Sequence, residues 1–147
     1  MKTLRFFPLL ALLIIIPSLN LNAQCKAFAK RTCLPELGSY THDGNYHAAV
    51  LSEGEEAELY KTFYSDMEYR LSLCAEETIP SVEFMVYDSN RNLIYSSKDA
   101  NYARTWDFRL ESSQQLRIVI KVNTSSSQGV TPASGCVSIM FGFKLKS

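Results

Sequence analysis

The four cysteines are the residues whose chemistry the sequence defines best. They are Cys25, Cys33, Cys74 and Cys136, and no two of them form a C-x-x-C pair. That spacing disfavours a thiolate metal site, and an even count in an exported chain favours two disulfides. Three pairings are possible. On an unbroken helix Cys25 and Cys33 would lie about 12 Å apart, too far to bond, so they can pair only across a turn. We favour Cys25 with Cys33 and Cys74 with Cys136.

Both histidines of the chain, His42 and His47, flank a turn made by Asp43, Gly44 and Asn45. Two imidazoles beside one carboxylate suit a metal ion or a general base, but a metal site needs a third ligand at a defined spacing. The sequence also lacks a G-x-S-x-G elbow, a Gly-rich phosphate loop and an H-E-x-x-H motif. We therefore predict a structural turn, no catalytic residue, no metal and no cofactor.

Four tyrosines, Tyr60, Tyr64, Tyr87 and Tyr95, lie opposite or at the edge of the predicted core faces. Amphipathic rings of this kind suit contacts with proteins or glycans. The alternative interpretation is that they cover sheet edges and the N-terminal segment. These tyrosines are our candidate binding residues, for a protein or glycan partner that the sequence does not identify.

The first 23 residues have the pattern of a secretory signal peptide. Lys2 and Arg5 form a basic start, Leu9–Ile16 is an unbroken apolar run, and cleavage is expected after Ala23. A spanning helix needs about 20 apolar residues, which disfavours a membrane anchor. We predict an exported protein of the periplasm, the outer-membrane surface or the extracellular space.

Cleavage after Ala23 leaves residues 24–147 as a single domain. It removes two of the 15 basic residues and none of the 15 acidic ones, for a net charge of −2. The remaining basic residues are scattered among acids, which argues against nucleic-acid binding. A lipoprotein signal would need a small residue before Cys25, where Gln24 stands. We expect no transmembrane segment after cleavage.

Residues 82–95 predict a β-hairpin. Val82, Phe84 and Val86 recur at every second position, residues 88–92 are short and polar, and residues 93–95 resume an apolar run. An isolated hairpin is marginal in water, so further strands must cover its apolar face.

The stretch that follows Ser52 has two interpretations. Ser52 and Glu55 could form a capping box that opens a helix. Against this, residues 57–63 and 67–73 alternate strictly and are separated by a turn at Ser65 and Asp66. We favour two strands.

Alternation continues over residues 106–110, 116–122 and 137–145, with a long polar loop at 123–135 that we expect to be mobile. The predicted fold is all-β, an antiparallel β-sandwich or jelly-roll-like fold of roughly 7 to 9 strands. Residues 24–40 form an N-terminal disulfide-tied clasp with a helical turn at 27–29. The predicted inward set is Phe84, Trp106, Ile118 and Phe141.

Several motifs carry a resemblance to known families. They are Glu53-Gly54-Glu55, Thr62-Phe63-Tyr64, Tyr69-Arg70-Leu71, the 82–95 hairpin, Trp106-Asp107-Phe108 and Gly135-Cys136-Val137. In this order they resemble small exported Bacteroidota proteins of unknown role and, more distantly, the bacterial pre-peptidase C-terminal β-sandwich. That sandwich is usually appended to secreted hydrolases and sometimes binds calcium through acids. Here Asp43, Asp66, Asp88 and Asp99 lie on separate loops, so the resemblance implies no calcium ligand.

Taken together, the sequence favours an exported, non-catalytic binding or envelope-associated module. One alternative is a purely structural domain stabilised by its disulfides. Another is a weak hydrolase centred on His42 and His47.

Overall fold

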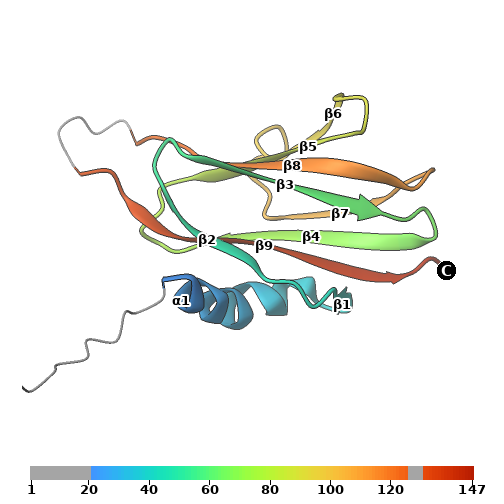
Figure 1. Cartoon of the computed structure of the whole chain (residues 1–147), viewed down its shortest axis with the longest axis horizontal. Helices are drawn as coiled ribbons and strands as arrows, with labels where there is room; N and C mark the ends of the chain where they lie inside the picture. The colour runs from blue at the N-terminus through green and yellow to red at the C-terminus, as the bar shows by residue number, and fades with distance from the viewer. Residues whose placement is uncertain (1–20, 126–130) are drawn as a thin grey trace, which may run out of the picture.

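The structure is a computed structural model that describes residues 21–125 and 131–147. In these residues nine strands form two antiparallel sheets, and a short helical segment lies against the outside of one sheet (Figure 1). This confirms the predicted all-β antiparallel sandwich and its number of strands.

The helical segment runs from α1 (Leu21–Phe28) through the π-helical turn η1 (Ala29–Cys33) to the 3-10 turn η2 (Leu34–Leu37). The strands that follow are β1 (Thr41–His42), β2 (His47–Ser52), β3 (Glu56–Phe63), β4 (Met67–Ala75), β5 (Val82–Tyr87), β6 (Leu93–Ser96), β7 (Thr105–Arg109), β8 (Gln114–Val122) and β9 (Ser134–Leu145).

The two sheets differ in strand order. Sheet A has the order β1-β9-β4-β7, and β2 also pairs with β9 beside β1. Sheet B has the order β3-β8-β5-β6. The predicted hairpin is confirmed as β5 and β6, and β6 forms one edge of sheet B.

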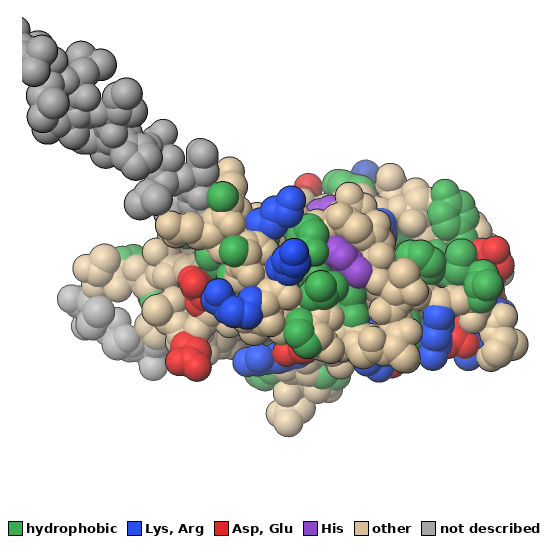
Figure 2. All heavy atoms as spheres, turned by 90° about the horizontal axis from the view of Figure 1, so that it is seen from below, with side chains coloured by type: hydrophobic (Ala, Val, Ile, Leu, Met, Phe, Trp, Pro, Cys, Tyr) green, Lys and Arg blue, Asp and Glu red, His purple; other side chains and the backbone are tan. Residues whose placement is uncertain are grey.

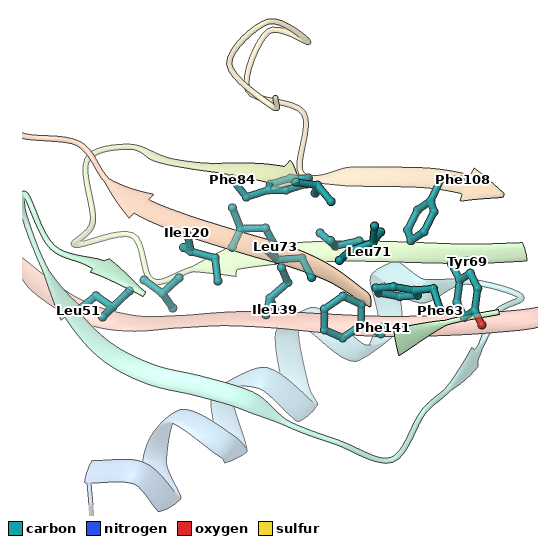
Figure 3. Packing of buried hydrophobic residues seen from close by; sticks show 14 of the residues in the cluster. Leu51, Phe63, Tyr69, Leu71, Leu73, Phe84, Phe108, Ile120, Ile139 and Phe141 are labelled. Carbon is teal, nitrogen blue, oxygen red and sulfur yellow. The ribbon is translucent and has the colours of Figure 1, made fainter. Parts of the chain in front are cut away.

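The core lies between the sheets and is built by the alternating apolar residues of each strand (Figure 3). On β8 the inward residues Leu116, Ile118, Ile120 and Val122 are all buried. Of the predicted inward set, Phe84, Ile118 and Phe141 are fully buried. Trp106 is half-buried and stacks on Phe108, with ring centroids 4.2 Å apart.

Two strands, β3 and β4, occupy the stretch that could also have been read as a helix, so the strand prediction is confirmed. Part of the capping-box pattern is nevertheless present. The Ser52 N–H donates to Glu55 Oε2 at 3.0 Å, inside the turn that joins β2 to β3. The same residue pair that caps a helix can therefore also close a turn between strands.

The helical segment is longer than the single turn predicted at 27–29. Its residues Cys25, Phe28, Ala29, Cys33 and Leu37 share one side and are buried. They pack on the outer face of sheet A, where Met140 of β9 is fully buried beneath them. As a result β9 is buried on both faces, which one-sided alternation did not predict. In the full chain this segment is not N-terminal, because twenty residues precede it.

Both disulfides fasten the helical segment to sheet A. Cys25 is bonded to Cys136 of β9, with a Cα–Cα distance of 5.2 Å, and Cys33 to Cys74 of β4, at 5.7 Å. The favoured pairing of Cys25 with Cys33 and of Cys74 with Cys136 is therefore wrong. The physical reason is that residues 25–33 are helical, and residues eight apart on a helix are too distant to bond.

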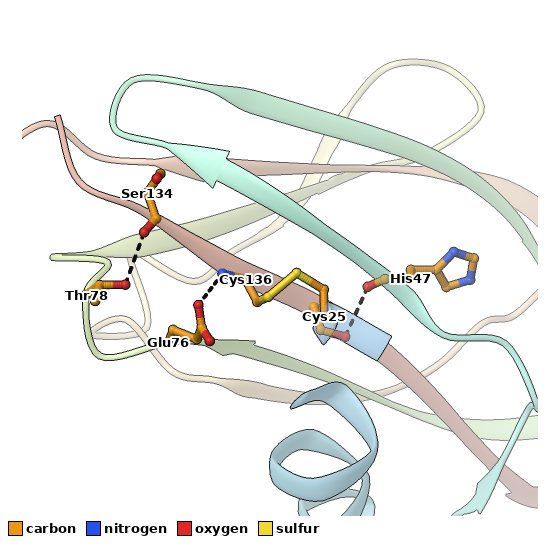
Figure 4. Close-up of a disulfide and its surroundings, with 7 residues drawn as sticks. Cys25, His47, Glu76, Thr78, Ser134 and Cys136 are labelled. Carbon is orange, nitrogen blue, oxygen red and sulfur yellow. Dashed lines mark hydrogen bonds between the residues drawn. A yellow bond between two sulfur atoms is a disulfide. The ribbon is translucent and has the colours of Figure 1, made fainter. Parts of the chain in front are cut away.

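Hydrogen bonds next to the first disulfide hold the start of β9 in place (Figure 4). Glu76 Oε2 accepts the N–H of Cys136 at 2.7 Å, and the Thr78 hydroxyl donates to the carbonyl of Ser134 at 3.2 Å. The strand therefore begins within the predicted 123–135 loop, at Ser134.

Parts of two predictions lie outside the described residues. These are residues 1–20 of the predicted signal peptide and residues 126–130 of the predicted loop. The last residues of that predicted peptide, Leu21–Ala23, form the start of α1. Across the described ranges, no helix has both the length and the apolar character needed to cross a membrane.

Candidate functional site

The outer face of sheet B carries a row of three side chains that runs across its three adjoining strands. Tyr60 on β3 and Tyr87 on β5 are both register partners of Arg117 on β8. Adjacent strands lie about 4.8 Å apart, so this register places the two tyrosine Cα atoms roughly 10 Å from each other with the arginine between them. Tyr60 is 58% exposed, and Tyr87 and Arg117 are half-buried.

Arg117 is oriented by its neighbours on this face. Its guanidinium lies 4.5 Å from the centroid of the Tyr87 ring, within the range of a cation–π contact. Its Nη1 donates to Glu58 Oε2 at 3.1 Å. The pair is exposed to solvent, so this salt bridge orients the arginine more than it stabilises the fold.

A hollow of about 480 Å³ lies at this row and is rich in hydrogen-bond donors. Its wall is formed by Tyr60, Tyr87, Asp88, Ser89, Arg91, Gln115 and Arg117. We call it the arginine hollow.

The β5–β6 loop forms one side of the arginine hollow and is held by Asp88. The Asp88 carboxylate accepts the backbone N–H groups of Asn90 and Asn92, each at 2.8 Å, and the Asn92 side-chain amide at 3.0 Å. The hydrogen bonds from Asn92 lower the pKa of Asp88. Arg91 stands at the tip of this turn with a φ of 67°, a left-handed conformation that is uncommon outside glycine.

An acidic region adjoins the arginine hollow along the same face. A second hollow of about 460 Å³ shares Tyr87 and Arg117 with it and is lined by Glu56, Glu58 and Glu83 together with Lys121. The register explains the grouping, since Glu56 and Glu83 both pair with Lys121. The outer face of sheet B therefore changes from acidic to basic along its strands.

The other two predicted tyrosines lie elsewhere. Tyr95 stacks on Trp106 with ring centroids 4.5 Å apart and contacts Phe84, so it closes the edge of the core. Burial raises its pKa. Tyr64 is 56% exposed and lines a smaller apolar hollow of about 210 Å³ with Tyr69. The structure thus brings together Tyr60 and Tyr87 of the four.

The two histidines flank the β1–β2 connection. His42 Nε2 is 3.0 Å from the carbonyl oxygen of Asn45, inside the predicted turn. The His47 ring packs edge-on against Phe141, with centroids 5.6 Å apart, and its pKa is lowered, mainly by burial. Over residues 21–125 and 131–147, no group of three or more His, Cys, Asp or Glu side chains could hold a metal ion.

The outer face of sheet A, on the opposite side of the molecule from this site, is covered by the helical segment (Figure 1). Figure 2 views the side that bears the helical segment, where Lys and Arg side chains and histidine lie among apolar side chains. Beyond the helix, Arg70 of β4 makes a two-pronged ion pair with Asp107 of β7, each N–O distance being 2.7 Å. Glu68 is contacted by both Arg109 and Lys144. The charged side chains of β4, β7 and β9 named here are therefore paired with one another.

Arg117 and Arg91 are residues of this site that the sequence analysis did not select. Arg117 stands at a polar position of the alternating sequence of β8. The useful signal is that Tyr60, Arg117 and Tyr87 are all outward-facing, but their alignment depends on strand pairing. Arg117 and Tyr60 lie 57 positions apart, so alternation within one strand cannot give their register.

Comparison with known proteins gives a likeness of fold. No protein-family model and no curated protein matches the chain. Among solved structures, the chain is similar to PliG from Aeromonas hydrophila, a periplasmic inhibitor of g-type lysozyme, with a TM-score of 0.52 and 8% identity. The match covers 72% of this chain and 89% of PliG. At this identity the match supports the β-rich fold, and the resemblance to exported Bacteroidota proteins stays a prediction.

Proposed function

We propose that this chain is an exported, non-catalytic module that binds a protein partner through the outer face of sheet B. The observation that carries the proposal is the cross-strand row Tyr60–Arg117–Tyr87 on a sheet face that no other element covers in the described residues. Tyrosine and arginine are enriched among the residues that contribute most to protein interfaces.

The contrast between the two outer faces supports this choice. On sheet A, the helical segment buries Met140 and the disulfides, and Arg70, Arg109 and Lys144 pair with acids of the same face. On sheet B, Val119 and Met85 lie among polar and charged side chains that surround two adjoining hollows. This mixture of aromatic, apolar and charged side chains at an accessible surface suits contact with a protein partner.

Export is supported by two disulfides, which persist in oxidising compartments, and by the N-terminal signal pattern. The likeness to PliG, a periplasmic inhibitor of g-type lysozyme, is consistent with a module that acts by binding a protein. It also supplies a defined first probe, purified g-type lysozyme, to be tested for binding and for loss of lytic activity.

The direct test places a photo-crosslinking phenylalanine analogue at position 60 of the exported chain. The matched control carries the same analogue at Tyr102, another exposed tyrosine, which lies in the loop before β7 and outside the proposed face. We expect a protein adduct at position 60 that is absent at position 102. We also expect Tyr60→Ala and Arg117→Ala to weaken binding of that protein at least tenfold, the loss typical of interface hot spots.

The alternatives give different results in the same experiment. A purely structural domain gives no adduct at position 60. A glycan-binding module gives a carbohydrate adduct, and binding that is unaffected by Tyr60→Ala and Arg117→Ala places the interface elsewhere. Each of these three outcomes overturns the proposal.

A further inference from the structure

We propose that the arginine hollow binds a carboxylate side chain, from Asp or Glu, that the protein partner presents. This inference rests on the proposed function and specifies its partner chemistry. It assigns Arg117 and Arg91 as the groups that recognise the anion.

The charged side chains around the arginine hollow favour an anion. The arginine hollow is lined by two arginines and one acid, Asp88. The Asp88 carboxylate is occupied by the three N–H donors of its own loop, so it positions the loop that carries Arg91 and does not pair with either arginine. The charge available to a ligand in this hollow is therefore positive.

The guanidinium of Arg117 has the geometry to bind a carboxylate. A guanidinium has five N–H donors in one plane, and it matches the two oxygens of a carboxylate in a bidentate contact. In the described part of the chain, Arg117 donates from Nη1 to Glu58, and its guanidinium lies over the ring of Tyr87. These two contacts position the guanidinium and, among the described residues, leave further N–H donors at its edge.

A carboxylate from a partner would compete with Glu58 for Arg117. Glu58 already neutralises part of Arg117, but the side chains of this pair are 51% and 35% exposed. Exposed ion pairs of this kind contribute little to stability. A carboxylate held by the two arginines of this hollow can therefore replace or join Glu58 at small cost.

The experiment is a titration of the folded, oxidised chain, followed by ¹H–¹⁵N NMR, with N-acetyl-glutamate α-amide. The neutral isostere N-acetyl-glutamine α-amide is the matched probe. We expect millimolar-order binding of the charged probe, as for a small exposed ligand. Shifts should centre on residues 87–91 and 115–117, weaken with added salt, and be at least tenfold weaker for the neutral probe.

Variants test the assignment to these arginines. Arg117→Gln should abolish the localised shifts, and Arg117→Lys, which keeps the charge but loses the fork, should weaken binding at least fivefold. Arg91→Gln should weaken it by a smaller factor. Arg109→Gln, on the outer face of sheet A, is the control and should leave the titration unchanged.

Equal shifts from the charged and neutral probes overturn the inference, and so does unchanged binding by both Arg117 variants. Shifts of similar size at Arg109 and in the arginine hollow also overturn it, because they indicate an adventitious anion only. These failures are separable from failure of the proposed function. An adduct at position 60 without carboxylate binding leaves the interface standing and removes only its proposed chemistry.

Discussion

At the scale of single residues, carboxylates hold the loops of this protein by accepting backbone N–H groups. Glu53 accepts the N–H of Ser125 at 2.8 Å and that of Ala133 at 2.9 Å, so one side chain joins the two ends of the β8–β9 connection to the β2–β3 turn. Its own N–H donates to the carbonyl of Ala133 at 3.0 Å. The hydrogen bonds from Ser125, its side chain first, and from Ala133 lower the pKa of Glu53 below its ordinary value of 4.5.

This gives a prediction for an acid titration by NMR. The amide signals of Ser125 and Ala133 should move together with a midpoint below pH 4.5. Because the folded pKa is the lower one, the contribution of Glu53 to stability is complete above its ordinary pKa and is lost as the pH falls through the folded value. Glu53→Gln should remove the shared transition, and a midpoint at or above 4.5 would contradict these contacts.

A second carboxylate, Asp43, bridges the two sheets at one open side of the sandwich. It lies 2.7 Å from the ammonium group of Lys61 on β3 and also accepts the N–H of Asn45 at 2.9 Å. Burial opposes ionisation of Asp43, but the hydrogen bonds from Lys61 and Asn45 outweigh it, and the pKa is lowered from 3.8.

We expect Asp43→Asn to lower the free energy of unfolding at pH 7 by roughly 1.5–3 kcal/mol, the range for a hydrogen bond to a charged group. The wild-type advantage should be complete above pH 3.8 and should shrink as the pH falls through the lower folded pKa. Urea unfolding at pH 7 and at successively lower pH measures it. Asp99→Asn, in an exposed turn, is the control, and an advantage that persists in strong acid would count against the ion pair.

At the scale of elements, the helical segment depends on its two disulfides. The Cys25–Cys136 and Cys33–Cys74 bonds span 111 and 41 positions. Loop-closure entropy gives about 4.8 kcal/mol for the longer loop and about 3.9 kcal/mol for the shorter. Replacing Cys25 and Cys136 by Ala should therefore destabilise the protein more than replacing Cys33 and Cys74, as measured by guanidinium unfolding.

Hydrogen exchange tests where that stability is located. The buried residues of the helical segment form a cluster separate from the core between the sheets. In either double variant we expect the protection of residues 21–37 to fall by a larger factor than that of β8, whose amides exchange through global unfolding. Equal loss of protection in both regions would show that the segment and the sandwich unfold as one unit. The reverse order of stability would contradict the dependence on loop length.

The same elements show what the sequence could and could not predict. Alternation is a property of one strand and its solvent, so it located β3, β4, β5 and β8. Only one turn of the helical segment was predicted, although Cys25, Phe28, Ala29 and Cys33 recur at helical spacing. The pattern is short, and two of its members were assigned to a disulfide with each other. Once that helix is accepted, the geometric limit on residues eight apart excludes the pairing that we had favoured.

At the scale of the whole molecule, the two sheets differ in what covers their outer faces. Which face is covered is a tertiary property, because it depends on where the helical segment docks. Sequence parity places Met140 of β9 and Met85 of β5 alike on outward positions. In the structure Met140 is fully buried beneath the helical segment, whereas Met85 is half-buried on the bare face. The alignment of Arg117 with Tyr60 and Tyr87 was unpredictable for the same reason, since it requires pairings between distant strands.

This difference leads to a matched prediction from two identical substitutions. Met140→Lys places an ammonium group in an apolar site under the helix and should lower the free energy of unfolding by more than about 3 kcal/mol. Met85→Lys leaves the ammonium group in water, and its cost should stay below about 1 kcal/mol. Guanidinium unfolding of both variants at pH 7 provides the comparison. Similar losses would mean that the outer faces are equally covered, and the outer face of sheet B would then no longer be available to a partner.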